Sequence, residues 1–159
     1  MKTALFAPLA LALGTLALAA CDRAKPAADA PSEGRQAISV TDGRLVLPAV
    51  NGNPGAVYFT VHNPTDDAAT LSGAQVKGAQ SAMIHRMTMT GGVASMDMVA
   101  QVAVPAKGEL TFAPGGLHLM AMHLDAALQK GGKTEASLTF AGGEKVSFPV
   151  AILAAGDAR

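Results

Sequence analysis

Residues 135–152 read EASLTFAGGEKVSFPVAI, and this stretch decides the fold. Apolar and polar side chains alternate on both sides of Gly142-Gly143. A period of two is typical of a β-strand with one buried face. A glycine pair between two such runs favours a hairpin with a primed-type turn. We therefore predict two antiparallel strands here.

The same alternation extends through the chain from residue 38. Residues 57–62 alternate apolar and polar side chains, and the turn cluster Asn-Pro-Thr-Asp-Asp follows at 63–67. Weaker strand candidates are 38–41, 44–47, 69–76, 102–104 and 109–113, and only 125–130 could form a helical turn. The pattern predicts an all-β domain, namely an antiparallel Greek-key β-sandwich or barrel of eight or nine strands, cupredoxin-like (Ig-like) in outline.

The first 20 residues have the layout of a secretory signal peptide, with Lys2 before an almost wholly apolar run. A transmembrane helix is less favoured, because the run is short and contains Pro8 and Gly14. Its end, LAAC at 18–21, resembles the bacterial lipoprotein processing box, in which the peptide is cut before the cysteine and the thiol is lipidated. An ordinary signal peptide with an accidental cysteine is the alternative.

This N-terminal pattern predicts the organisation of the chain. We expect a lipoprotein signal peptide at 1–20, a lipidated Cys21 with a flexible tether at 21–37, and one folded domain at 38–159. The protein would then lie on the periplasmic side, held to a membrane by its lipid. Asp22 resembles a retention signal that favours the inner membrane.

Composition excludes several classes of function. Twelve basic and twelve acidic residues balance, so there is no electrostatic footprint for nucleic acid. Cys21 is the only cysteine. If it carries lipid, the mature domain has no thiol for a disulfide, for thiol catalysis, for zinc or for blue-copper electron transfer.

Soft metal donors are concentrated in residues 83–122, which hold seven of the eight methionines and, with His123 just beyond, three of the four histidines. Thioether sulfur is a soft ligand and imidazole a borderline one. Together they suit Cu(I), whereas calcium and magnesium prefer oxygen ligands. The composition of this stretch predicts a copper carrier.

A hairpin with Gly91-Gly92 as its two-residue loop would order these donors. It would pair Met87 with Met96, His85 with Met98, and Met89 with Ala94, all on one face. His85 and Met96 would then be diagonal neighbours, about 7 Å apart at Cβ. His118 and Met120 share one face of another strand. Bringing the two pairs together would make a tetrahedral set of two sulfurs and two nitrogens.

The alternative is that the methionine face is simply buried core, since methionine is a common core filler. Two histidines on that face argue against it, because an apolar face rarely accommodates an unpartnered imidazole. His62 stands outside the spacing and is expected to be an exposed or hydrogen-bonded surface residue.

The spacing His-x10-Met-x21-His-x-Met resembles that of the periplasmic copper chaperones called PCuAC. AVYF at 56–59, Asn63 and PGGLHLM at 114–120 fit as well, and the resemblance spans 38–152. It implies a cupredoxin-like domain that hands copper to cytochrome c oxidase subunit II, at the binuclear copper centre, or to a thiol-containing assembly factor. The Cu(I) ligands that it implies are His85, Met96, His118 and Met120.

Other donors could surround this set: Met87, Met98, Met122 and His123. His123 departs from the family's pattern and would add a fifth donor near the site. Lipidation is also not expected of every member of the family.

Three function classes follow. The favoured one is a copper chaperone. The others are a copper-sequestering or resistance lipoprotein with the same ligands, and a non-metal interaction module whose methionine face binds an apolar partner. An enzyme is not expected, because the sequence offers no Ser/His/Asp or Cys/His arrangement, no close carboxylate pair and no glycine-rich phosphate loop. We expect a monomer attached to the membrane through its lipid.

Overall fold

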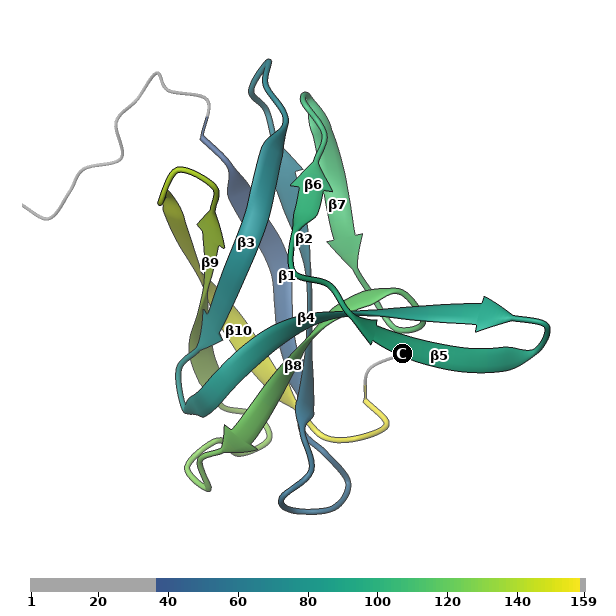
Figure 1. The fold of residues 1–159 in the computed structure, drawn as a ribbon. Helices are drawn as coiled ribbons and strands as arrows, with labels where there is room; N and C mark the ends of the chain where they lie inside the picture. The colour runs from purple at the N-terminus through teal and green to yellow at the C-terminus, as the bar shows by residue number, and fades with distance from the viewer. Residues whose placement is uncertain (1–36, 158–159) are drawn as a thin grey trace, which may run out of the picture. The chain divides into compact units, whose positions relative to one another are not determined.

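The computed structural model describes residues 37–157, which form an all-β domain without helices (Figure 1). Its ten strands are β1 (Ser39–Val46), β2 (Gly55–Asn63), β3 (Ala69–Val76), β4 (Ala79–Thr90), β5 (Val93–Met98), β6 (Val102–Val104), β7 (Gly108–Phe112), β8 (Leu117–Leu124), β9 (Lys133–Phe140) and β10 (Lys145–Leu153). Within the described part there is accordingly no helix that could span a membrane. The predicted signal peptide, Cys21 and nearly all of the predicted tether lie outside the described residues.

Seven of these strands close into a barrel. The order is β4-β8-β2-β1-β10-β9-β3, and β3 returns to β4 through the pair Ala74–Ala82. Strands β5, β7 and β6 are not part of this ring. They pair with β4, β2 and β3, respectively. The all-β prediction is confirmed, although there are ten strands and not eight or nine.

One pairing departs from the predicted antiparallel sheet. β1 and β10 run parallel, with Arg44 opposite Ala151 and Val46 opposite Leu153. Alternation within a strand does not encode the direction of its partner, because both arrangements turn successive side chains to opposite faces. The first and last strands therefore close the barrel in a way that local pattern could not predict.

The core is filled by the apolar positions of the alternating strands. Along β2, Val57, Phe59 and Val61 are buried. The ring of Phe59 stacks on Phe112 with centroids 4.3 Å apart and meets Phe148 at 5.1 Å. Each fully buried side chain of this kind contributes about 1.5–3 kcal/mol. Because β2 lies between β8 and β1, this packing fixes the strands that carry the donor residues.

The turn cluster after β2 is organised by Asn63, which is almost completely buried. Its amide nitrogen donates to the carbonyl oxygens of Asp67 and Pro105, at 2.8 and 3.1 Å. Its amide oxygen accepts from the N–H and the hydroxyl of Thr65. One side chain thus ties the predicted turn to the segment that follows β6.

The two predicted glycine-pair hairpins differ in their loops. At Gly91-Gly92 the loop has two residues, both with positive φ, and Thr90 pairs with Val93 as a primed turn requires. Between β9 and β10 the N–H of Phe140 donates to the carbonyl of Glu144, so that loop spans three residues, 141–143. The second hairpin is confirmed, but its primed turn was a wrong prediction. Residues 125–130 make turns and no helix.

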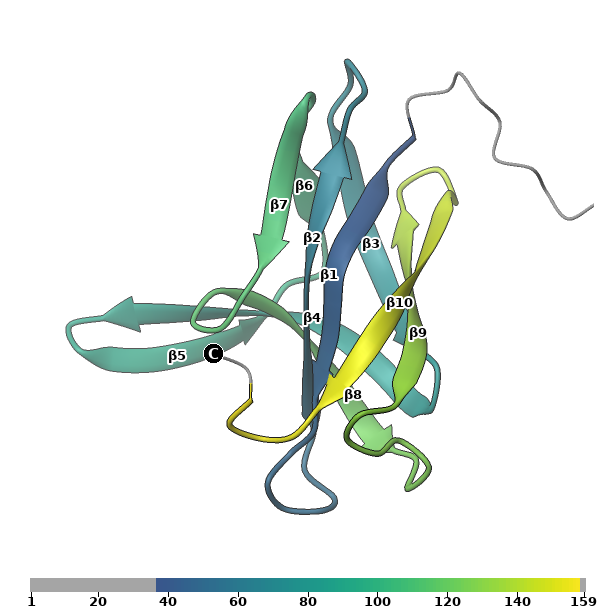
Figure 2. The same ribbon diagram turned by 180° about the vertical axis from the view of Figure 1, so that it is seen from behind.

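The β4–β5 hairpin projects from the barrel (Figures 1 and 2). β4 pairs with β8 from Ala79 to Arg86, whereas its remaining residues pair with β5 alone. The N–H of Met87 also donates to the carbonyl of Gly116 at 3.0 Å. Past that bond, the hairpin is held only by its own ladder.

Candidate metal centre

Two histidines face each other where β4 leaves the barrel. His85 of β4 is directly opposite His118 of β8, and their ring centroids are 6.0 Å apart. Both side chains lie on the face opposite the core, because their neighbours Ile84 and Leu119 are buried inside it. The two residues are 33 positions apart in the sequence, and the sheet brings them together.

His118 is held in one orientation. Its Nδ1 is 3.1 Å from the carbonyl oxygen of Gly116. A carbonyl can only accept, so Nδ1 carries the proton in the neutral ring and Nε2 keeps its lone pair. The turn places that carbonyl, because the N–H of Gly116 donates to Ala113 at 3.0 Å. An imidazole fixed in this way presents Nε2 as a metal ligand.

His85, in contrast, has no hydrogen bond that orients its ring. Both of its ring nitrogens are buried, and neither has a hydrogen-bond partner. Burial lowers the pKa of His85, and the neighbouring His118 lowers it further. Both effects favour the neutral ring, which is the form that binds a metal. Most buried polar atoms in proteins are satisfied, so this imidazole stands out as one available to a ligand.

Met120 and Met83 lie one step along the same face. Met120 follows His118 by two positions on β8, and it is directly opposite Met83. Both side chains are half-buried. The structure therefore brings three of the four expected ligands together, namely His85, His118 and Met120.

The fourth expected ligand, Met96, lies on the other side of β4. The predicted register is confirmed, since Met96 is opposite Met87 and Met98 is opposite His85. Met96 is thus a diagonal neighbour of His85, but it is separated from β8 by the width of β4. Met98, expected only in the surroundings, has the more direct position. The side chain of Met96 is 46% exposed and that of Met98 68%.

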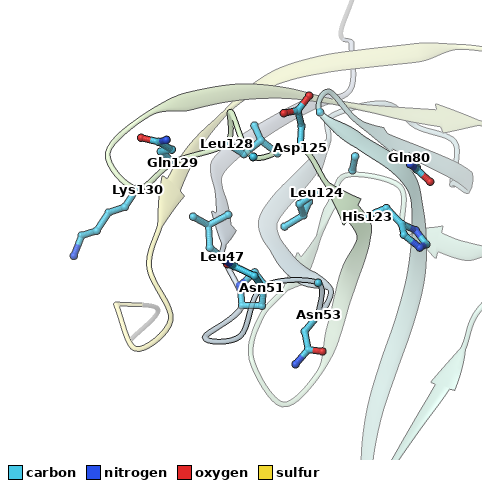
Figure 3. Close-up of a pocket in the computed structure, with 15 residues that line it drawn as sticks. Leu47, Asn51, Asn53, Gln80, His123, Leu124, Asp125, Leu128, Gln129 and Lys130 are labelled. Atoms are coloured by element: carbon cyan, nitrogen blue, oxygen red, sulfur yellow. The ribbon is translucent and has the colours of Figure 1, made fainter.

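His123 is not brought to this site. It lies five residues beyond His118 along β8, which is about 16 Å in an extended strand. It is exposed, its φ is positive at 51°, and it lines a separate cavity of about 930 Å³ together with Leu124 and Leu128 (Figure 3). Met122, the remaining donor, is half-buried opposite Ser81.

His62 also lies outside the site, as expected. Its Nδ1 is 2.8 Å from a carboxylate oxygen of Glu109, and its Nε2 is 2.8 Å from the hydroxyl oxygen of Thr41. It is a hydrogen-bonded surface residue.

A row of side chains crosses neighbouring strands in the order Met98, His85, His118, Tyr58 and Arg44. Tyr58 and Arg44 are the last two members of this row. The ring of Tyr58 is 6.5 Å from that of His118, and the guanidinium of Arg44 is 5.6 Å from the centre of the Tyr58 ring. Burial raises the pKa of Tyr58, against an opposing effect of Arg44. The sequence pattern did not assign these residues to the site, because pairing of β1 with β2 and of β2 with β8 is needed to place them there.

The chemistry of the site is that of neutral, soft donors. Among residues 37–157 there is no cluster of three histidine, cysteine or acidic side chains that could hold a metal. Two imidazoles with several thioethers are the donors present, and this set favours Cu(I) over hard cations.

Comparison with known proteins gives the family. The family model described as "Putative lipoprotein LpqE-like" matches residues 38–152. The chain belongs to the LpqE-like family. A relative described as "Putative lipoprotein Lxx21020", from Leifsonia xyli subsp. xyli (strain CTCB07), is 31% identical over 126 residues, which cover 79% of this chain and 75% of that protein.

Solved structures similar to this LpqE-like domain include PCuAC domains. The copper-bound PCuAC domain from PmoF2 has a TM-score of 0.61 at 21% identity, covering 74% of this chain and 92% of that one. The apo PCuAC domain from PmoF1 has a TM-score of 0.60 at 26% identity, covering 74% and 93%. CuI-DR1885 from Deinococcus radiodurans has a TM-score of 0.58 at 30% identity, covering 77% and 80%. The predicted cupredoxin-like, Ig-like fold is confirmed.

Proposed function

We propose that this LpqE-like protein is a copper chaperone that binds Cu(I) through His85, Met96, His118 and Met120. The observation that carries the proposal is the His85–His118 pair, in which the buried ring nitrogens of His85 bond no protein group and His118 presents a fixed Nε2. The solved structures of similar fold include one named as copper-bound and one as a CuI form, which supports the choice of metal.

The two sulfurs complete the set from either side of the histidines. Met120 is next to His118 on β8, and Met96 approaches from the projecting hairpin. Because β4 beyond Met87 is held by β5 alone, bending of the hairpin can carry Met96 toward the ion. The resulting site has two sulfurs, two nitrogens and no ligand charge.

A site of this kind is suited to giving copper up. Thiolates are softer and carry charge, so Cu(I) prefers a partner that offers cysteines. Subunit II of cytochrome c oxidase or a thiol-containing assembly factor would be such an acceptor. The exposure of Met96 lets an acceptor reach the ion directly. The protein is a carrier and not an enzyme, and it acts as a monomer.

The carrier would be attached to a membrane through Cys21. The sequence LAAC at 18–21 and the lipoprotein descriptions of the family and of the Leifsonia relative support lipidation. The protein would face the periplasm, and Asp22 favours the inner membrane.

The test is X-ray absorption on protein carrying Cys21→Ser, loaded with Cu(I). We expect one ion with two sulfur and two nitrogen neighbours. His85→Ala and Met96→Leu should each reduce the affinity by at least about tenfold, since even an outer-shell partner is typically worth that much. Met122→Leu is the matched control and should bind normally. A spectrum with only oxygen and nitrogen around Cu(I) would refute the proposed ligands.

Transfer distinguishes a chaperone from a copper-sequestering lipoprotein. Copper-loaded protein is mixed with an apo, cysteine-containing oxidase copper domain, and the metal is followed by NMR. Copper should move to the acceptor. If it stays with this protein against every such acceptor, sequestration is the better description.

A further inference from the structure

The projecting hairpin carries more thioethers than the proposed site uses. On the outward face of β4 and β5, at the positions beyond His85 and Met98, three methionines are neighbours: Met87, Met89 and Met96. We call them the thioether triangle. Met87 and Met96 are directly opposite, about 5 Å apart at Cβ, while Met89 is two positions from Met87 and diagonal to Met96, about 7 Å from each.

Packing does not account for these methionines. Met89 is 66% exposed, Met96 is about half exposed, and every residue of β5 is exposed, while Met87, nearest the barrel, is half-buried. The hairpin therefore buries little on this face, and the role of core filler that methionine often has does not apply here.

The two faces of the hairpin differ in chemistry. The face opposite the triangle carries Arg86, Thr88, Ser95 and Asp97, of which Ser95 donates to the Asp97 carboxylate at 3.3 Å. On the triangle face, the residues from Met87 around the turn to Met96 include no acidic or basic side chain. Hard cations have no oxygen ligands there, so the triangle selects for soft monovalent ions.

We propose that Met87, Met89 and Met96 form a second, solvent-accessible Cu(I) subsite made of thioethers alone. It shares Met96 with the proposed histidine site, so an ion can pass between the two while it remains bound to one sulfur. Met98, directly opposite His85, is placed to take over as the second sulfur of the histidine site when Met96 turns outward. The inference rests on the proposed function only for the identity of the ion.

The subsite explains why the hairpin projects. Copper held between His85 and His118 would be partly enclosed, whereas the triangle lies past the last β4–β8 pair, on the hairpin that projects from the barrel (Figure 1). An acceptor could collect the ion there without approaching the barrel.

The experiment follows each methionine separately through its ε-methyl NMR signal, in the full chain carrying Cys21→Ser. Cu(I) is added under reducing conditions to a background variant, His118→Ala, that disables the histidine site. We expect the signals of Met87, Met89 and Met96 to shift together with the first equivalent, and that of Met122 to stay. Adding Met87→Leu and Met89→Leu should weaken this binding by more than about tenfold.

His118 is buried, so His118→Ala could disturb the fold, and His85→Ala serves as a second background. Unshifted Met87 and Met89 signals in a folded background variant would overturn the subsite. The proposed function is judged independently in the unsubstituted protein, where Cu(I) should shift the imidazole signals of His85 and His118. Shifts of the triangle without imidazole shifts would retain the subsite and refute the histidine site.

Discussion

His85 and His118 are paired across two strands, but the protein prepares them in different ways. A backbone carbonyl orients His118, whereas no protein group bonds to His85. One ligand is thus preorganised and the other is free to adjust to the ion. The rigid ligand, His118, is on the barrel strand β8. The adjustable ligand, His85, is at the point where β4 begins to leave the barrel.

The lowered pKa of His85 predicts the pH dependence of copper binding. Burial disfavours the charged ring, so protons compete with Cu(I) for His85 only at a pH below the ordinary value of 6.5. The affinity should therefore be nearly constant down to about pH 6.5 and fall at lower pH, approaching about tenfold per pH unit as His85 protonates. Competition with a Cu(I) chelator across this range measures it.

A matched variant, Met122→Leu, should give the same profile because it leaves both imidazoles in place. The prediction fails if the affinity already falls tenfold between about pH 8 and pH 7, since that would require a ligand with a raised pKa.

At the scale of elements, the Gly91-Gly92 turn sets the register of the methionine face. Both glycines have φ values that other residues adopt only at a cost, φ being 60° and 82°. The two-residue loop pairs His85 with Met98 and Met87 with Met96. A one-residue slip would turn every one of these side chains to the other face.

We expect Gly92→Ala to weaken copper binding by up to about five- to thirtyfold. The left-handed conformation costs a residue with a Cβ about 1–2 kcal/mol, and the isolated β4–β5 ladder has little else to offset it. Chelator competition measures the affinity.

Gly52→Ala is the control for this substitution. Gly52 has a similar φ of 91° and open space around it, but it lies in the loop before β2. It should cost similar backbone energy and leave the affinity unchanged. Equal loss of affinity in both variants would mean that the hairpin register is not what matters.

For the whole molecule, the ligands lie outside the core that holds the barrel together. The core side chains of β2 and β8, such as Val57 and Leu119, face away from His118. The domain should therefore fold without copper, and the far-UV circular dichroism should be the same with and without Cu(I). The ion should only raise the melting temperature by mass action, by an amount equivalent to about 2.7 kcal/mol at a hundredfold excess over Kd.

Thermal unfolding with Cu(I) and with a chelator tests this, and Met122→Leu should respond to the ion like the unsubstituted protein. A chelator-treated domain that lacks β-structure at low temperature would contradict it, because the metal would then be part of the folding free energy.

A structural feature of this protein can be predicted from the sequence when the residues that determine it are close together in the chain. Alternation is local, so strands such as residues 57–62 and the pairing of His85 with Met98 could be predicted. Barrel closure could not, because the β1–β10 pair joins the two ends of the domain. His123 is a second example. It is close to Met120 in the sequence, but because β8 is extended, it lies far from the histidine pair. The ligand roles themselves stay predictions.

The parallel pairing of β1 with β10 has a mechanical consequence. Because the first and last strands run in the same direction, the start of β1 and the end of β10 lie at opposite ends of their shared ladder. A pull between the two ends of the domain would act along that ladder, so its hydrogen bonds would share the load in shear and would not open one after another. A carrier held at one end and pulled by a partner at the other would resist unfolding along this seam.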